Sequence, residues 1–183
     1  MTLNIRAMTG ADKTAIMHIL HDTPEFKPAE VLVAEELLDW YLQDPAGSGY
    51  HVLVAEIGGS VAGYVCYGPT PLTESTWDMY WTAVSREERG RGVGSALWGV
   101  AERKISEASG RLVIVETSSK PEYENTRLFF LSRGYEEAGR IGDFYALGDD
   151  LVIFKKGLCR GTSSAGAEAA PCRLSEPQST CAQ

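Results

Sequence analysis

Hydrophobic and polar positions along this chain follow two different periods. Apolar residues recur at helical spacing in four segments, and runs rich in β-branched and aromatic residues lie between these segments. The helical pattern predicts helices at about residues 9–20, 29–42, 93–108 and 125–133. The strand-like runs are residues 3–8, 50–57, 61–67, 80–84, 112–117, 135–141 and 151–155.

The order of these segments predicts how the strands pair. The strand at 80–84, the helix at 93–108 and the strand at 112–117 form a βαβ crossover. Residues 112–115 are apolar at every position, as expected for a strand buried on both faces beside a parallel neighbour. Gly58-Gly59-Ser60 favours an antiparallel hairpin between the second and third strands. The sheet is therefore predicted to be mixed, and the fold class to be α/β or α+β.

Length and composition indicate one domain followed by a tail. The chain has 183 residues, of which 44% are hydrophobic, as in an ordinary globular core. Beyond Gly157 the sequence is of low complexity, so we expect a domain over residues 1–157 and a disordered tail over residues 158–183. The sequence shows neither a signal peptide nor a membrane span, and we expect a cytoplasmic protein without a membrane partner.

Charge and cysteine spacing argue against two classes of partner. The formal net charge of −8 disfavours nucleic acid, whose phosphates require a basic face. It suits a cationic substrate, although solubility alone also explains an acidic chain. The cysteines, Cys66, Cys159, Cys172 and Cys181, have no Cys-x-x-Cys spacing, so neither a zinc site nor a disulfide framework is expected, and we predict no metal.

A glycine-rich segment connects the strand at 80–84 to the following helix. It reads Arg89-Gly90-Arg91-Gly92-Val93-Gly94-Ser95. Glycines let successive amides turn toward one centre, and the helix adds roughly half a positive charge at its N-terminus, which favours an anion such as pyrophosphate. A Walker loop would need a lysine before Ser95, and the spacing of the glycines does not fit a dinucleotide fingerprint. The pattern that the segment does match is Arg-x-x-Gly-x-Gly, with Arg89, Gly92 and Gly94 at the fixed positions.

This pattern resembles the acetyl-CoA signature of the GNAT superfamily of N-acetyltransferases. The resemblance covers most of residues 3–156, because Asn125 and the segment Phe129-Phe130-Leu131-Ser132-Arg133-Gly134-Tyr135 follow in the family's order. It implies a central mixed sheet of about seven strands flanked by about four helices. It also implies acetyl-CoA as cosubstrate.

The resemblance assigns cofactor contacts to three places. Amides of the loop would bind the pyrophosphate: Arg89, Gly90, Arg91, Gly92, Val93, Gly94 and Ser95. Backbone groups of Ala83 and Val84 would pair with the pantetheine arm like an extra strand. Asn125 would contact the cofactor from the other side, and its alternative role is that of a helix N-cap.

Candidate catalytic residues follow from the same resemblance. Asp78 stands where some members carry a glutamate base, and alternation places it on one face with Tyr80, Thr82 and Val84. Glu116 is the second choice of base. Phe130 stands where many members have the tyrosine that protonates the departing thiolate, and phenylalanine cannot donate. Tyr123 and Tyr145 are possible substitutes, although Tyr145, expected in a loop between the last two strands, is equally a pocket wall or a core aromatic.

The first functional hypothesis is therefore a CoA-dependent N-acetyltransferase. An amine of a small molecule or a polypeptide would attack the thioester directly, with the enzyme positioning the reactants, accepting the ammonium proton and stabilising the oxyanion. The absent tyrosine at Phe130 motivates an alternative, an acyl-CoA-binding module without turnover. A third reading makes the glycines a structural turn only. A homodimer is a reasonable expectation for the assembly.

Overall fold

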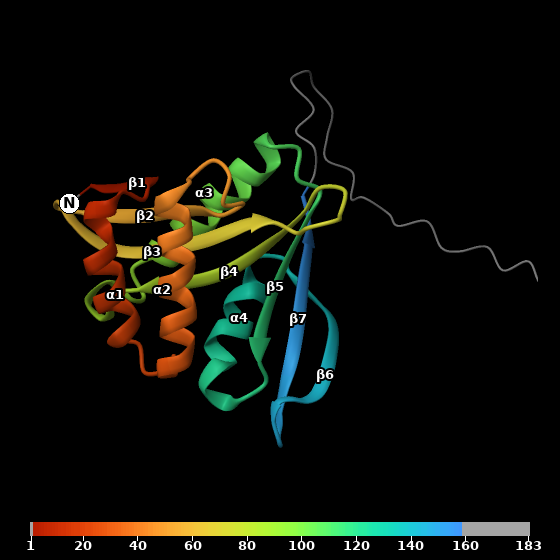
Figure 1. The fold of residues 1–183 in the computed structure, drawn as a ribbon. Coiled ribbons are helices and arrows are strands. Elements are labelled where there is room, and N and C mark those ends of the chain that lie inside the picture. Colours follow the sequence, from red (N-terminus) through yellow and green to blue (C-terminus); the bar gives the residue numbers. More distant parts are fainter. Residues whose placement is uncertain (1, 159–183) are drawn as a thin grey trace, which may run out of the picture.

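One mixed sheet forms the centre of the protein. The computed structural model describes residues 2–158 (Figure 1). Cys159, Cys172 and Cys181, and all but the first residue of the expected tail, lie outside the described residues. The described strands are β1 (Leu3–Ala7), β2 (His51–Ile57), β3 (Ser60–Pro69), β4 (Thr76–Val84), β5 (Leu112–Ser118), β6 (Glu136–Ala146) and β7 (Asp149–Gly157). The helices are α1 (Lys13–His21), α2 (Pro28–Gln43), α3 (Val93–Glu107) and α4 (Glu124–Ser132), with short 3₁₀ turns η1 (Gly10–Asp12), η2 (Arg86–Glu88) and η3 (Pro121–Tyr123).

The strand order confirms the predicted mixed sheet. The seven described strands lie in the order β1-β2-β3-β4-β5-β7-β6. β4 and β5 are parallel and joined by α3, which is the predicted βαβ crossover, whereas the other neighbours are antiparallel. β7 inserts between β5 and β6, so β6 forms an edge of the sheet.

Helices cover both faces of the sheet and bury two separate apolar layers. α1 and α2 pack on one face, where the core includes Ile16, Leu20, Leu38, Val54 and Tyr64. α3 and α4 pack on the other face, where the core includes Leu97, Ile105, Val113, Phe130 and Phe154. Each fully buried Leu, Ile or Val contributes roughly 1.5–3 kcal/mol. These layers fix the sheet, and with it the strand ends that carry the candidate site.

The last two strands are longer than the sequence predicted. We expected a loop over residues 142–150, but β6 continues to Ala146 and β7 begins at Asp149. Gly148, with φ +75°, makes the tight turn between them. Asp143 and Asp150 support it, because the Gly148 amide donates to Asp143 and the Asp143 amide donates to Asp150. Tyr145 therefore lies in a strand, and its placement in a loop was wrong.

Two features that would indicate a particular partner are absent from residues 2–158. No helix there is both long and apolar enough to cross a membrane. That part of the chain also contains no group of three or more His, Cys, Asp or Glu residues placed to hold a metal ion.

Candidate active site

An opening lies between β4 and β5. The two strands pair only from Thr76 opposite Leu112 to Met79 opposite Val115. Beyond that point β4 stays with β3 as far as Val84, and β5 stays with β7, so the two strands diverge (Figure 1). The β5-facing edge of β4 after Met79 therefore has no strand partner, and its amides and carbonyls can pair with an extended ligand.

A β-bulge in β4 marks the start of this opening. Cys66 of β3 lies opposite Trp81, and the next residue, Tyr67, lies opposite Met79, which leaves Tyr80 as the extra residue. A bulge bends its strand and increases the local twist. β4 consequently turns away from β5 immediately after their last pair.

The bulge also changes which side chains share a face of β4. Met79 packs in the α3 layer, so its neighbour Asp78 faces α1 and α2. Past the bulge, Ala83 belongs to the α1–α2 layer and Val84 packs against the α3 layer. The expected common face of Asp78, Tyr80, Thr82 and Val84 is therefore wrong, because the extra residue reverses the alternation between Asp78 and Val84.

The glycine-rich segment forms the N-terminus of α3. Gly90 and Gly92 have φ angles of +74° and +82°, which L side chains adopt only with strain. Ala96 donates the first hydrogen bond of the helix, to the Gly92 carbonyl at 2.9 Å. The preceding amides of α3 therefore have no acceptor within the helix and are available to an anion.

A cavity of about 390 Å³ lies in front of these amides. It is lined by Val84, Glu88, Arg89, Gly90, Gly92, Val93, Gly94, Ser95 and Phe129. All of the predicted loop residues except Arg91 line it, together with Val84 from the unpaired end of β4. The structure thus brings the predicted pyrophosphate loop and the predicted pantetheine edge to one cavity.

The two loop arginines bind other protein groups. Arg89 donates from Nε to the Val84 carbonyl at 3.2 Å and from Nη2 to the hydroxyl of Thr23 at 3.1 Å. Its Nη1 lies 3.7 Å from a carboxylate oxygen of Glu25. Arg91 pairs with Glu88 at 3.3 Å and is largely exposed. An anion at this loop would therefore be bound chiefly by backbone amides.

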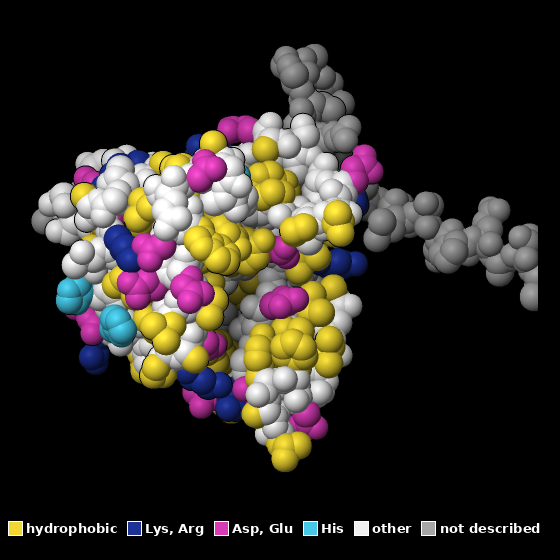
Figure 2. Space-filling view, viewed as in Figure 1, with side chains coloured by type: hydrophobic (Ala, Val, Ile, Leu, Met, Phe, Trp, Pro, Cys, Tyr) yellow, Lys and Arg dark blue, Asp and Glu magenta, His cyan; other side chains and the backbone are white. Residues whose placement is uncertain are grey.

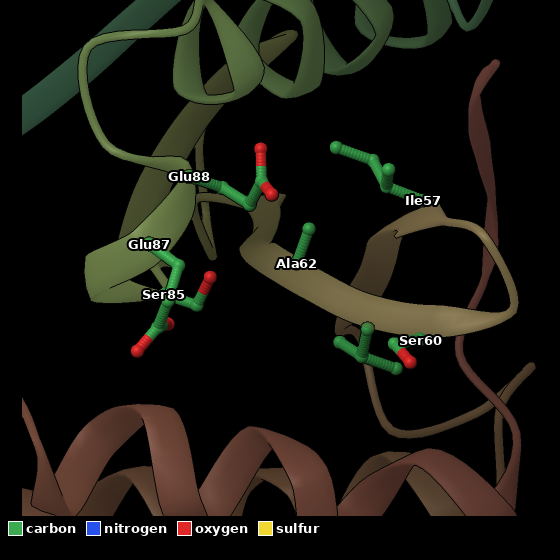
Figure 3. Close-up of a pocket in the computed structure, with 7 residues that line it drawn as sticks. Ile57, Ser60, Ala62, Ser85, Glu87 and Glu88 are labelled. Atoms are coloured by element: carbon green, nitrogen blue, oxygen red, sulfur yellow. The ribbon is translucent and has the colours of Figure 1, made fainter. Parts of the chain in front are cut away.

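A second, smaller cavity of about 240 Å³ lies beside the first, between η2 and the β2–β3 hairpin. Its lining includes the side chains of Glu87 and Glu88 together with Ser60, Ala62 and Ser85 (Figure 3). It has two carboxylates and no cationic side chain in its lining. This composition disfavours a phosphate group, whereas the larger cavity is lined by the N-terminal residues of α3.

Two carboxylates lie on one face of the opening. Val113 and Val115 pack in the α3 layer, so Glu116 faces the α1–α2 side, as Asp78 does on the neighbouring strand. Burial raises the pKa of Glu116, and the negative charge of Asp78 raises it further. Asp78 accepts a hydrogen bond from the hydroxyl of Thr70 at 2.6 Å. The two candidate bases are therefore neighbours.

Two tyrosines, Tyr80 and Tyr145, lie within range of the charges of these carboxylates. Burial raises the pKa of Tyr145, and the charges of Glu116, Asp149 and Glu30 raise it further. Burial, followed by the charge of Asp78, raises the pKa of Tyr80 to about 12. Both phenols thus keep their proton at neutral pH and can donate it. Sequence reasoning gave Tyr80 no chemical role, because the bulge that directs it has no local sequence signal.

An aromatic row extends from Tyr80 toward α2. Tyr50 contacts Tyr80 edge-on, with ring centroids 5.5 Å apart, and stacks on Trp40 at 6.3 Å. Trp40 is 56% exposed, whereas its neighbour Tyr41 is buried in the α1–α2 layer. Figure 2 shows a hollow between the α1–α2 half and the β5–β7 half of the molecule, with acidic and apolar side chains around it. Negative and aromatic side chains of this kind favour a cation over an anion.

The resemblance singled out two positions of α4, Asn125 and Phe130. Asn125 is exposed and lies in the first turn of the helix, whose N-cap is Tyr123, so its alternative role as N-cap is wrong. Phe130 is 4% exposed and packs against Trp98 and Phe154. The aromatic ring at this position therefore belongs to the apolar core on the α3 side.

Comparisons with known proteins agree with this geometry. A model of the acetyltransferase (GNAT) family matches residues 14–135. A crystal structure of a GNAT-family protein from Desulfovibrio desulfuricans is 35% identical, with a TM-score of 0.83, and the match covers 85% of this chain and 99% of that one. A search of curated proteins found no match.

Two more distant structures share the fold. The ribosomal-protein-alanine N-acetyltransferase of Brucella melitensis is 24% identical with a TM-score of 0.67, over 85% of this chain and 99% of that chain. An aminoglycoside 6′-N-acetyltransferase complexed with coenzyme A is 15% identical with a TM-score of 0.68, over 84% of this chain and 96% of that chain.

Proposed function

The chain belongs to the GNAT family of acetyltransferases, and we propose that it transfers the acetyl group of acetyl-CoA to a primary amine by direct attack on the thioester. The observation that supports this proposal is that two structural features line the same cavity. The unpaired end of β4 and the N-terminal amides of α3 both line it. An extended arm ending in a pyrophosphate is the ligand that fits both.

Acetyl-CoA would use backbone groups for most of its contacts. The pantetheine amides would pair with the β4 edge at Ala83 and Val84, and the pyrophosphate would accept hydrogen bonds from amides between Gly90 and Ser95. Because Arg89 already donates to the Val84 carbonyl, a ligand that uses this carbonyl shares it with Arg89 or displaces the guanidinium. Asn125 keeps its proposed role at the opposite side of the cofactor.

Glu116 is the base that we propose for the acceptor ammonium. Its pKa is raised, so its carboxylate binds a proton more tightly than an ordinary glutamate does. Asp78, which accepts a hydrogen bond from Thr70, raises this basicity through its charge. An ammonium with a pKa near 10 would pass its proton to Glu116 directly or through a water, and the neutral amine would then attack the carbonyl carbon.

Tyr145 is the acid that we propose for the departing CoA thiolate. Its raised pKa keeps the phenol protonated, and the charge of Glu116 contributes to that shift, so the base and the acid belong to the same part of the site. The thiol of CoA has a pKa of ~8.5, so a single weak donor suffices when the tetrahedral intermediate collapses. The acetyl–sulfur bond breaks, the sulfur takes the phenol proton, and the amide remains on the acceptor. The proton that the nitrogen loses as the amide forms returns to the Tyr145 oxygen, which restores the phenol.

The acceptor is proposed to be a cationic amine of a small molecule or a polypeptide. Carboxylates on α2, β4 and β5 contribute negative charge around the hollow, which attracts an ammonium group. The fold neighbours named above include enzymes for a ribosomal protein and for aminoglycosides, so the same fold accommodates both sizes of acceptor. The homodimer expected from the sequence stays a prediction.

Calorimetry and turnover together test this function. We expect the full-length protein to bind acetyl-CoA with micromolar affinity and to bind ATP much more weakly. We also expect it to consume the thioester when a panel of primary amines is supplied. Binding without consumption in the whole panel would favour the alternative of a non-catalytic acyl-CoA-binding module. Absence of CoA binding by folded protein would refute both.

A further inference from the structure

The segment that joins α1 to α2, residues 22–27, touches both sides of the opening. We call it the α1–α2 connection. Thr23 accepts a hydrogen bond from Arg89, which follows β4. The Glu25 carbonyl accepts a hydrogen bond of 2.6 Å from the hydroxyl of Tyr123, which lies in η3 after β5. The α1–α2 connection is thus bonded to one residue that follows β4 and to one residue that follows β5.

Further contacts seat this connection on the site. The Phe26 ring meets Trp81 of β4 edge-on, with centroids 5.6 Å apart. Thr23 is 7% exposed, and its hydroxyl also donates to the Ile19 carbonyl at 2.7 Å, so it has both a donor and an acceptor partner. The contacts of Phe26 with Trp81 and of Thr23 with Arg89 are long-range, and they hold the connection that leads into α2 against β4 and the residues that follow it.

We propose that Arg89 and Tyr123 are positioning residues that clamp the α1–α2 connection across the opening and thereby set the wall against which the acceptor amine binds. This inference rests on the proposed function for its kinetic part. Without the clamp, the connection would still link the two helices, but its position relative to β4 and β5 would be less defined. The acceptor would then lose affinity while the cofactor loop kept its amides.

Two conservative variants weaken one anchor each. Tyr123→Phe removes the hydroxyl that donates to the Glu25 carbonyl. Thr23→Val removes the hydroxyl that accepts from Arg89 and donates to the Ile19 carbonyl, and it leaves the glycine loop and the 3.7 Å contact between Arg89 and the Glu25 carboxylate in place. Tyr64→Phe is the matched control, because the hydroxyl of Tyr64 is buried and has no hydrogen-bond partner among the described residues. Like Tyr123→Phe, this variant removes one tyrosine hydroxyl, but it breaks no hydrogen bond.

Hydrogen exchange tests the clamp independently of acetyl transfer. We expect amides of residues 22–27 to exchange about fivefold to tenfold faster in Tyr123→Phe and in Thr23→Val than in the wild type, and to be unchanged in Tyr64→Phe. Equal exchange in all four full-length proteins, each shown to be folded by circular dichroism, would overturn the clamp. This measurement needs no acceptor.

Kinetics then separates positioning from a merely structural tie. At saturating acetyl-CoA we expect both variants to raise the acceptor KM about fivefold, with the acetyl-CoA Kd within about twofold of wild type in both and kcat within about twofold in Thr23→Val. Faster exchange with an unchanged acceptor KM would show that the tie is structural only. If wild-type protein acetylates no amine, the proposed function and the positioning role both fail, while the exchange result still decides whether the clamp exists.

Discussion

Replacement of Gly94 by aspartate should weaken cofactor binding strongly without weakening the fold. Gly94 has no positive φ, and a Cβ there would contact only the Val84 side chain, at an ordinary 3.6 Å. A glycine inside a helix costs about 0.5–1 kcal/mol relative to alanine, and a carboxylate in the first turn gains about 0.3–1 kcal/mol from the helix dipole. The free energy of unfolding should therefore equal or exceed that of the wild type.

The effect on affinity has the opposite sign. The new carboxylate would lie on the order of 5 Å from the pyrophosphate, and at an effective dielectric constant of about 20 each pair of like charges costs about 3 kcal/mol. Acetyl-CoA affinity should consequently fall at least 100-fold, since about 1.4 kcal/mol corresponds to a factor of ten. Gly94→Asp would therefore stabilise α3 and at the same time weaken the binding of acetyl-CoA.

Calorimetry and urea unfolding on the same samples provide the assay. Gly94→Asn has nearly the same bulk without the charge and should lose less affinity. Gly99→Asp adds the same charge to the same helix beside Arg103 and Arg133, away from the cavity lining, and should leave affinity within about threefold. Wild-type affinity in folded Gly94→Asp would refute the assignment of the pyrophosphate to this loop. Gly92→Asp is a poorer probe, because a positive φ at Gly92 adds about 1–2 kcal/mol of strain.

Four other substitutions test the proposed chemistry and the electrostatics of the fold. Glu116→Gln should lower kcat about 100-fold, whereas Asp78→Asn should retain turnover and shift the acid limb of the pH–rate profile to lower pH, because it removes a charge that raises the pKa of Glu116. Steady-state kinetics between about pH 5 and about pH 9 measures both, and an unmoved limb with lost turnover would make Asp78 the base. Tyr145→Phe should lower kcat about tenfold with the acetyl-CoA Kd unchanged; equal kcat would leave Tyr145 as a wall of the acceptor side. Asp12→Asn should cost about 2 kcal/mol of unfolding free energy near pH 7, because hydrogen bonds from Arg6 lower the pKa of the buried Asp12 carboxyl from 3.8 to about 2. That stability is present above the ordinary pKa and is lost as the pH falls toward 2, so urea unfolding should show the difference shrinking between about pH 4 and about pH 2; a difference independent of pH would contradict the charge argument.

Local features of the site could be predicted from the sequence. The requirement for glycine at Gly90 and Gly92 is a property of each residue's own φ, and the helix that follows shows its period within a few turns. The βαβ crossover around them was confirmed because two strands joined through a helix normally pair in parallel in one sheet, so the order of the elements was enough to predict it. These features follow from local sequence and from the order of the elements.

Features that depend on distant residues could not be predicted. Asp78 and Glu116 are brought together by pairing of β4 with β5, and the tie from Tyr123 to the Glu25 carbonyl spans 98 residues. The turn after β6 was mistaken for a longer loop because Asp143 and Gly148 are typical loop residues, and only their hydrogen bond shows that they close a tight turn. The spacing of apolar and polar residues along the chain does not indicate which distant residues will be in contact.

One extra residue in β4 allows the strand to serve both halves of the proposed site. With regular alternation, Asp78 and Val84 would share a face and therefore the same helix layer. The bulge at Tyr80 instead leaves Asp78 facing the α1–α2 side, near Glu116, and turns Val84 toward α3, against the loop that would bind the pyrophosphate. The same bulge coincides with the point where β4 leaves β5, which exposes the edge for the pantetheine arm. Asp78, beside the proposed base Glu116, and Val84, at the proposed cofactor loop, thus lie on opposite faces of β4, so an acceptor can approach from the α1–α2 side while acetyl-CoA lies in the opening.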